Sequence, residues 1–267
     1  MAISLNIQYV SDIHLERNLD IDFNKLVDIS NPADVLILAG DIGCPKDPRF
    51  KAFLLKCNAH FKTTILVPGN HEYYSCFPDS LESTEHLMHK LCGDCSTTSS
   101  HKVIFLHKGN KHVVGHVNFI GATLWSHIPV NLNETYLNSI NSQVFRGIKI
   151  SEKDGALTVN SHNELFRKHL SGIEKSIEWG KQHNKKNVVI THHAPFMKAF
   201  KSEDLPKNHL YATELSQYLS YDSIHTWIYG HTHWNSLTSF NGTLVTCNQF
   251  GGPKGIRGWR AFATLMV

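Results

Sequence analysis

The chain has 267 residues, of which 41% are apolar, enough for one substantial buried core. Lys and Arg number 26 and Asp and Glu number 23, so the formal net charge is only +3. This small excess argues against a dedicated nucleic-acid-binding protein, and nucleic acid is not a favoured partner. The longest uncharged apolar runs fall far short of the roughly 18 residues that a membrane span needs, and the N-terminal segment lacks the features of a signal peptide. We therefore expect a cytoplasmic protein without membrane contact.

Strand-like and helix-like segments alternate along the chain. Strands are predicted at 3–10, 34–39, 63–67, 103–106, 117–125, 187–191, 226–229, 243–248 and 260–266, and helices near 48–60, 79–91 and 161–183. The last helix carries a sequence typical of a capping box, Ser161 followed by Glu164. The alternation predicts an α/β architecture in which helices cover the faces of sheets. No shift of composition marks a boundary, so residues 1–267 are predicted to form one domain.

The segment from about 126 to 160 interrupts this alternation. It is polar, rich in Asn and Ser, and weakly periodic. Such an insertion is usually a surface excursion or a lid over a site, and we expect one of these here.

Polar side chains follow five of the strand-like runs, each at the point where the run ends. They are Asp12 with His14, Asp41, Asn70 with His71, His192 with His193, and His231 with His233. In open α/β sheets, ligands bind outside the carboxyl ends of the strands. Five strand ends that deliver only Asp, Asn and His favour one shared site over ordinary packing.

The donor types at these strand ends predict a metal site. Carboxylate, amide and imidazole groups without a thiolate suit divalent ions; manganese is the expected metal, and iron, zinc, cobalt or nickel would also fit. If one of His192 and His193 is counted, there are seven candidate ligands, too many for one ion. Two ions that share a carboxylate would account for them. Two metals about 3.5–4 Å apart are a recurring device for phosphoryl hydrolysis.

The order of the motifs resembles that of the calcineurin-like metallophosphoesterase superfamily. The motifs are D-x-H at 12–14, G-D at 40–41, G-N-H-E at 69–72, H-H-A-P at 192–195 and G-H-x-H at 230–233. Each is weak alone, but five in this order are specific, and they extend over residues 9 to about 234. The stretches I-G-A-T-L-W and V-T-C-N-Q-F-G also resemble a small bacterial-type branch of the superfamily. The resemblance implies a four-layer α/β/β/α sandwich with the site at the strand ends.

By analogy with the family, each candidate residue has an expected role. One ion would take Asp12, His14 and His233, the other would take Asn70, His192 and His231, and Asp41 would bridge both. His192 is chosen over His193 because the first His after the strand is the ligand in similar motifs. A hydroxide between the metals would attack phosphorus, and His71 would stabilise the transition state or protonate the leaving group. The family often has an acidic or aromatic residue a few positions after G-D, where this chain has Cys44 and Pro45.

The expected activity is hydrolysis of small phosphate esters, with phosphodiesters preferred. A monoesterase commonly adds fixed Arg donors for a dianion. No Arg lies in or beside the five motifs; Arg17 is the nearest and Arg146 lies in the insertion. A phosphomonoesterase, a protein phosphatase and a nuclease of the same superfamily stay as alternatives, whereas a binding module that has lost catalysis is disfavoured because all seven candidate ligands are present.

Several other polar residues are expected to play no part in the chemistry. Glu72 is predicted to be a structural hydrogen-bonding partner. The six cysteines, including the C-x-x-C pair Cys92 and Cys95, are expected to be reduced thiols without a metal. No partner pattern accompanies His107, His112, His116 or His127.

Overall fold

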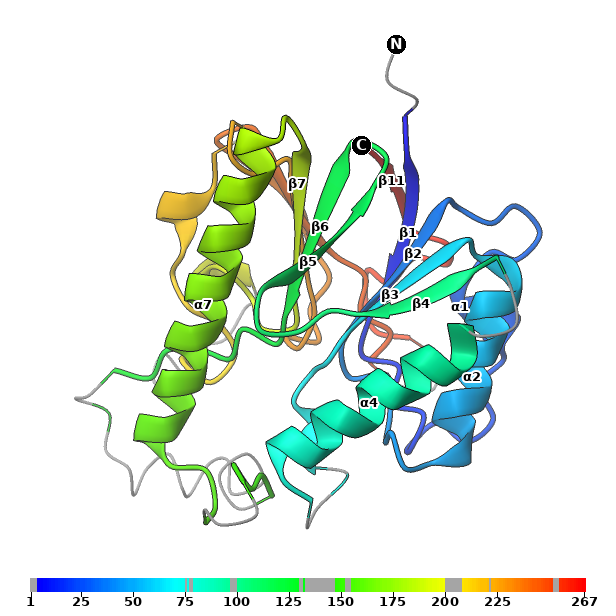
Figure 1. Ribbon diagram of the computed structural model, residues 1–267, viewed down its shortest axis with the longest axis horizontal. Helices are drawn as coiled ribbons and strands as arrows, with labels where there is room; N and C mark the ends of the chain where they lie inside the picture. The colour runs from blue at the N-terminus through cyan, green and yellow to red at the C-terminus, as the bar shows by residue number, and fades with distance from the viewer. Residues whose placement is uncertain are drawn as a thin grey trace.

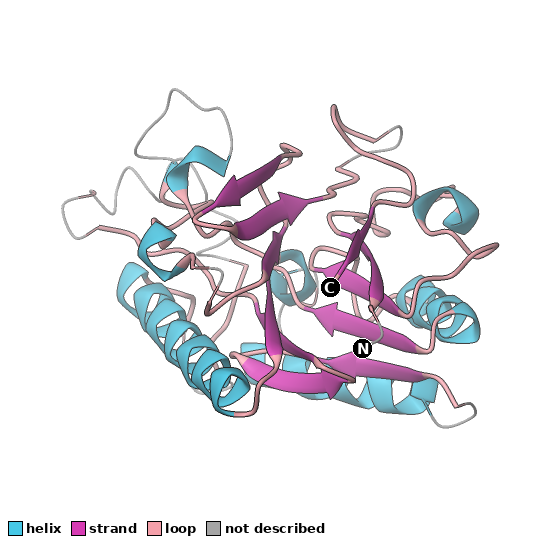
Figure 2. Ribbon diagram, turned by 90° about the horizontal axis from the view of Figure 1, so that it is seen from above, coloured by secondary structure: helices cyan, strands magenta, loops and turns pink. Residues whose placement is uncertain are grey.

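A computed structural model describes residues 4–74, 76, 79–96, 100–129, 132, 147–151, 155–199, 208–220, 222–251 and 255–267. Two β-sheets face each other, and helices cover their outer sides (Figure 1). The view from above in Figure 2 shows the strands in the middle of the molecule and the long helices outside them.

The first sheet has five strands. In spatial order they are β11 (Thr264–Met266), β1 (Asn6–Val10), β2 (Val35–Ala39), β3 (Thr63–Val67) and β4 (Lys102–Phe105). Strands β1 to β4 are parallel, and β11 pairs antiparallel with β1. All five residues of β2 are buried, as expected for a central strand with both faces covered.

The second sheet has six strands. In spatial order they are β5 (Asn110–Val114), β6 (Val117–Ala122), β7 (Lys186–Thr191), β8 (Thr226–Tyr229), β10 (Thr243–Cys247) and β9 (Leu237–Phe240). The four inner strands are parallel, and β5 and β9 are antiparallel edges. The inner strands are nearly continuous apolar runs, which matches their burial.

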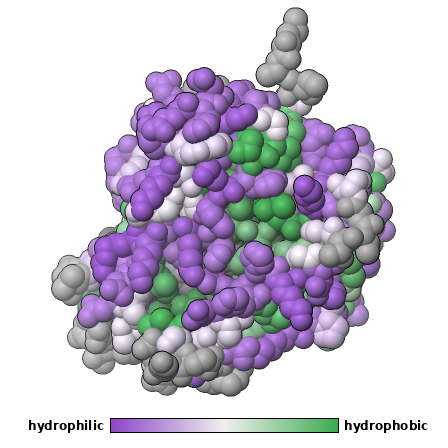
Figure 3. Space-filling view, viewed as in Figure 1, coloured by the Kyte–Doolittle hydropathy of each residue, from purple (hydrophilic) through white to green (hydrophobic). Residues whose placement is uncertain are grey.

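A compact apolar core joins the two sheets. Ile37 and Val67 of the first sheet belong to the same buried cluster as Phe119, Ile190 and Ile228 of the second. The exterior seen in Figure 3 is mainly hydrophilic, and apolar residues gather near the middle of that face, where the two sheets meet. The sheets are therefore held together by a shared interior, which fixes the relative position of their strand ends.

Helices complete the outer layers. They are α1 (Phe23–Leu26), α2 (Pro48–His60), α3 (His71–Tyr74), α4 (Leu81–Ser96) and α7 (Val159–Gln182), with single 3₁₀ turns η1 (Met197–Ala199) and η2 (Ser216–Tyr218). Helices α2 and α4 pack on the first sheet, and α7 packs along the second (Figure 1). The predicted four-layer α/β/β/α fold is confirmed. None of the helices in the described part of the chain is long and apolar enough to cross a bilayer.

Some predicted boundaries are wrong. Helix α7 starts earlier than expected because Thr158, with Ser161 three residues on, forms the reciprocal cap; Ser161 is not the cap itself. The strand predicted at 117–125 ends at Ala122, and the one predicted at 260–266 is confined to Thr264–Met266. The edge strands β5 and β9 were not predicted. Most of the insertion at 126–160 lies outside the described residues.

Candidate metal centre

The five motifs meet at one end of the molecule because the inner strands of both sheets run in the same sense. Asp12, Asp41 and Asn70 follow β1, β2 and β3 of the first sheet. His192 and His231 follow β7 and β8 of the second sheet. The two sets of strand ends are in contact, since the backbone N–H of His231 donates to Asp12 Oδ1 at 3.1 Å. Every one of the seven candidate ligands therefore lies in the same place.

An unusual backbone geometry places five of these residues. Asp12, His14, Asp41, His231 and His233 all have positive φ, between 48° and 71°. This left-handed region is uncommon for residues other than glycine, and such strain persists only where surrounding structure holds it. Here the N–H of Asp12 donates to Gly40 O and that of His14 donates to Asp41 O, both at 3.0 Å. These two hydrogen bonds hold the loops after β1 and β2 together.

Two glycines allow the sheets to approach closely at the site. Gly40 has φ +87°, and a Cβ there would collide with the His192 ring and with the backbone of Gly69. A Cβ on Gly230 would lie 2.8 Å from Asp12 Oδ2 and 2.9 Å from the Ala39 carbonyl oxygen. A side chain at either position would push the strand ends apart.

Candidate ligand atoms gather in three overlapping groups, each within 4.8 Å, in the described residues. The groups are Asp12 with His14 and His233, His14 with Asp41 and His71, and Asp41 with His192 and His231. Asp41 belongs to two of them. Its Oδ2 lies 3.9 Å from His14 Nε2, 3.8 Å from His71 Nε2 and 3.2 Å from His192 Nε2. One buried carboxylate oxygen therefore faces three imidazoles from different strands.

The hydrogen bonds of His192 leave a gap that a cation would fill. Its Nδ1–H donates to the Ala39 carbonyl oxygen at 3.0 Å, so the other ring nitrogen, Nε2, carries a lone pair in the neutral ring. Nε2 faces two acceptors, Asn70 Oδ1 at 3.0 Å and Asp41 Oδ2 at 3.2 Å. Burial lowers the pKa of His192, but the Asp41 carboxylate outweighs it and raises the pKa to about 9. The raised pKa favours the protonated ring in the metal-free protein, so these three atoms surround a position suited to a cation.

The group around Asp12 also combines a carboxylate with facing ring nitrogens. Asp12 Oδ1 lies 3.4 Å from His233 Nε2, and that nitrogen lies 3.3 Å from His14 Nε2. Burial raises the pKa of Asp12, but hydrogen bonding to His233 and the charge of His192 outweigh it, so that the pKa is lowered. The second oxygen accepts a hydrogen bond from Ser11 Oγ at 2.5 Å, which fixes the carboxylate. An ionised carboxylate and two facing ring nitrogens are a donor set suited to a divalent ion.

Of the two adjacent histidines, His192 belongs to a ligand group and His193 does not. Nδ1 of His193 donates to the Thr123 carbonyl oxygen at 3.2 Å, and its ring packs against those of Trp125 and His231. Burial and the neighbouring His231 hold the pKa of His193 well below its usual value, so the ring is neutral. His193 therefore supports the ring of His231.

Glu72 fastens the two loops that carry Asp41 and Asn70. Its carboxylate accepts hydrogen bonds from the backbone N–H groups of Asp41, Ile42, Gly43 and Gly69, at 2.7–3.1 Å. Burial and the charge of Asp41 raise its pKa to about 7. These four bonds satisfy backbone donors that the turns leave free, as expected for a structural role.

The model of the calcineurin-like phosphoesterase family matches residues 5–235. The chain belongs to this family. Members hydrolyse phosphate esters with divalent metal ions, which agrees with the donor groups found here. This phosphoesterase is 29% identical to an uncharacterised protein of Acanthamoeba polyphaga mimivirus, over 92% of this chain and 90% of the other.

Solved structures share the fold of this phosphoesterase. Phosphopantetheinyl hydrolase from Mycobacterium tuberculosis matches with a TM-score of 0.71 at 18% identity, over 100% of this chain and 97% of the other. A dimetal phosphatase from Danio rerio matches with a TM-score of 0.52 at 15% identity, over 97% and 91%. At these identities the likeness shows the fold alone.

One residue beside the candidate metal centre of this phosphoesterase was not predicted from the sequence. Glu16 Oε1 lies 3.2 Å from His14 Nδ1 and 3.4 Å from His71 Nδ1. The only signal was its position two residues after His14. Its contact with His71 depends on how the loop after β1 turns, which the sequence alone does not reveal.

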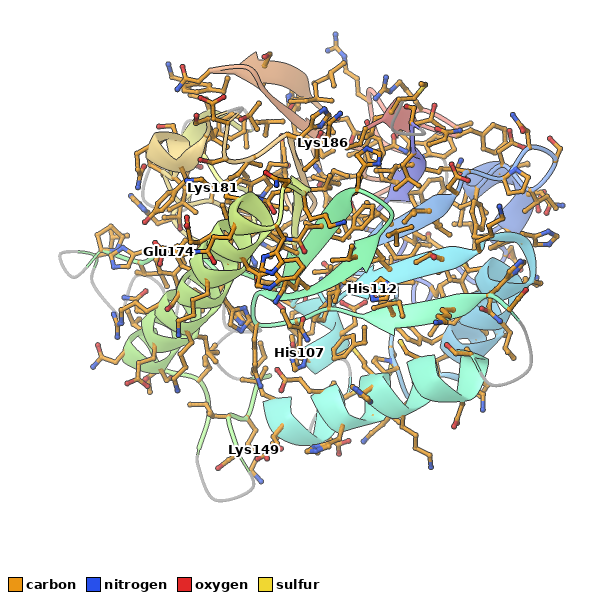
Figure 4. The ribbon with its side chains drawn as sticks, turned by 45° about the horizontal axis from the view of Figure 1, so that its top comes forward. His107, His112, Lys149, Glu174, Lys181 and Lys186 are labelled. Atoms are coloured by element: carbon orange, nitrogen blue, oxygen red, sulfur yellow. The ribbon has the colours of Figure 1, made fainter. Side chains whose placement is uncertain are left out.

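The remaining polar residues named from the sequence take no part in the three ligand groups. Arg17 is near the centre, with Nε 3.8 Å from Glu16 Oε1, and more than half exposed, whereas Arg146 lies outside the described residues. His107 and His112 belong to the β4–β5 connection and to β5 (Figure 4). His107 Nδ1 lies 3.5 Å from Glu85 Oε1. Burial raises the pKa of Cys92, in keeping with an inert thiol.

Proposed function

We propose that this chain hydrolyses phosphodiesters with two divalent metal ions, manganese first among them, bound on either side of Asp41. The observation that carries the proposal is the position of Asp41 Oδ2 between His14 of one ligand group and His192 of another. A single oxygen that faces both groups is suited to bridge two ions.

The donor set fits the two ions. One ion would be held by Asp12, His14 and His233, and the other by Asn70, His192 and His231, with Asp41 shared. His192 Nε2, Asn70 Oδ1 and Asp41 Oδ2 converge on the position that the second ion would take. His231 Nε2 lies 3.3 Å from the Leu210 carbonyl oxygen, which leaves Nδ1 for the metal.

When bound, the ions would activate the attacking water and neutralise the charge that grows on the phosphate oxygens. The chain's own residues would supply the rest. His71 is anchored by its backbone N–H, which donates to Asp41 Oδ1 at 2.8 Å. Its Nε2 faces the same centre, and its side chain is 13% exposed, so it can reach a leaving group. We assign it the delivery of a proton to the departing alkoxide.

The preference for diesters follows from charge. A diester carries one negative charge, which two metal ions can largely balance. A monoester dianion commonly needs further fixed cations. Arg17 lies near the centre, and its guanidinium lies toward Glu16 on a largely exposed side chain. An unfixed Arg of this kind supplies little orientation for a dianion.

The test compares bis(p-nitrophenyl) phosphate with p-nitrophenyl phosphate under one metal and one pH. We expect the diester to have the higher kcat/KM, and expect activity to disappear with a chelator and return with manganese. Elemental analysis should find two ions per chain. A monoester preference of about tenfold, equal to about 1.4 kcal/mol, would favour the phosphatase alternative. Full activity with no more than one ion would exclude the two-metal site.

A further inference from the structure

Glu16 stands beside the candidate metal centre without belonging to a ligand group. None of the three ligand groups found in the described residues includes it. Its side chain is 20% exposed, and Oε1 contacts the Nδ1 atoms of both His14 and His71. The two rings meet edge to face with centroids 4.4 Å apart, so one carboxylate oxygen lies against both.

These contacts decide which nitrogen of each ring carries the proton. An ionised carboxylate only accepts hydrogen bonds, so Nδ1 of His14 donates to it at 3.2 Å. The same oxygen, 3.4 Å from Nδ1 of His71, favours the proton on that nitrogen of the second ring. The Nε2 atoms then face the centre, 3.9 Å and 3.8 Å from Asp41 Oδ2.

The two histidines depend on Glu16 to different degrees. In the proposed assignment His14 is also held by its metal, whereas His71 is not a ligand. The backbone N–H of His71 is held by Asp41, but this bond does not orient the ring. The ring also packs on Tyr74, at a centroid distance of 4.3 Å, but an aromatic face does not select between the two nitrogens.

We propose that Glu16 is the positioning residue for His71: it accepts the Nδ1–H and so directs Nε2 toward the leaving group, where the doubly protonated ring gives up its Nε2 proton and is left neutral with the Nδ1 proton retained. This inference rests on the proposed function, because it assigns an orienting partner to the proton donor of that reaction. Glu16 acts through His71 and does not touch the substrate.

The first experiment varies the leaving group at saturating manganese, where weaker binding of metal by His14 no longer limits the rate. The Glu16→Gln variant keeps the shape of the side chain but loses its charge. Removal of a residue that orients an active-site histidine typically lowers activity about 10–100-fold. We expect a loss of that size in kcat for a phenyl diester. For a p-nitrophenyl diester, whose leaving group needs little protonation, we expect a loss of less than about threefold. KM should change little. Equal losses on both substrates would overturn the proposal.

Two further variants separate positioning from a general structural role. In the His71→Ala background, Glu16→Gln should cause no additional loss on the phenyl diester, because the residue through which it acts is gone. Glu16→Asp should recover part of the rate, since a carboxylate is restored. Glu164→Gln, an exposed glutamate on α7, is the control for removal of one negative charge and should behave as the wild type. Additive losses in the double variant would contradict the proposal.

The second experiment needs neither metal nor substrate. Long-range ¹H–¹⁵N spectra of the metal-free protein should show the neutral His71 ring protonated at Nδ1, and a mixture of both tautomers in Glu16→Gln. An unchanged tautomer in a folded Glu16→Gln variant would overturn the role of Glu16 whatever the activity. If the tautomer changes as expected but no phosphate ester is hydrolysed, Glu16 still orients His71 and the proposed function fails.

Discussion

Backbone strain is concentrated at the residues that we propose as ligands. Asp12, His14, Asp41, His231 and His233 all adopt left-handed conformations, although none is glycine. Each such residue costs of order 1–3 kcal/mol, which the buried sheets must offset. The benefit is a set of side chains that converge from three strand ends with little freedom left to lose when an ion binds.

At the residue scale, Asp41 and His71 should behave differently when removed. Asp41→Ala deletes the oxygen shared by two ligand groups, so we expect loss of metal measured by elemental analysis, and loss of activity with it. His71→Ala should retain both ions and lower kcat on a phenyl diester by about 10²–10⁴, the range for a lost general acid. Asp79→Ala, which breaks an exposed pair with Lys46, is the control and should retain both. Loss of metal from His71→Ala would show that His71 is a ligand.

Two glycines offer a matched pair of substitutions. Gly40→Ala places a Cβ against the His192 ring at φ +87°, so it should destabilise the fold and weaken metal binding. Gly93 lies on the exposed side of α4 with nothing within 4 Å of an added Cβ. Gly93→Ala should therefore stabilise the protein by about 0.5–1 kcal/mol, because glycine is a poor helix former. Chemical denaturation measures both; a neutral Gly40→Ala would contradict the close approach of the two sheets.

At the scale of elements, the cap of α7 can be tested directly. Thr158 and Ser161 satisfy each other's backbone donors, so Thr158→Ala should cost about 1 kcal/mol in the free energy of unfolding. The sequence had instead suggested Glu164, which takes no part in the cap. Glu164→Ala should stay within about 0.5 kcal/mol of the wild type. A larger loss of stability from Glu164→Ala than from Thr158→Ala would show that Ser161 and Glu164 form the cap, as the sequence predicted.

The inner strands and their polar ends could be predicted because burial on both faces leaves a continuous apolar run in the sequence. The edge strands β5 and β9 lack that signal. Strand β5 has no fully buried residue, and β9 is mostly exposed, so neither shows an apolar pattern. Glu16 could not be predicted for another reason. Its contact with His71 depends on the positive φ of Asp12 and His14. Asp and His seldom adopt positive φ, so the sequence does not predict this turn.

At the scale of the whole molecule, metal binding and protonation should compete. The pKa of His192 is raised to about 9 by Asp41 against the effect of burial, and that of His14 is raised against burial by Glu16 and Asp41. In the metal-free protein, protons on these rings stabilise the fold below pH 6.5, the ordinary value, and this stabilisation is lost as the pH rises toward 9. A metal needs the neutral rings, so its stabilising effect should change in the opposite direction.

We therefore expect the rise in Tm caused by manganese to grow between pH 6.5 and 9, the range over which His192 loses its proton. Calorimetry in buffers of different ionisation enthalpy should find a proton released near pH 7 when the site that contains His192 binds its ion. His231 is not expected to contribute, because burial lowers its pKa to about 3 and the ring is already neutral. Metal affinity that is independent of pH across this window would refute the arrangement of protons described here.

The division of the candidate ligands between the two sheets has a consequence for the time at which the centre can form during synthesis. Asp12, His14, Asp41 and Asn70 lie within the first 70 residues of the chain and are made first. On the proposed assignment, each ion also needs at least one histidine from 192, 231 and 233, which are made near the end. The early part of the chain alone offers neither ion a complete set of ligands, so a ribosome-bound chain that ends before residue 192 should not hold metal tightly. Metal acquisition would then be a late step that follows the docking of the second sheet on the first.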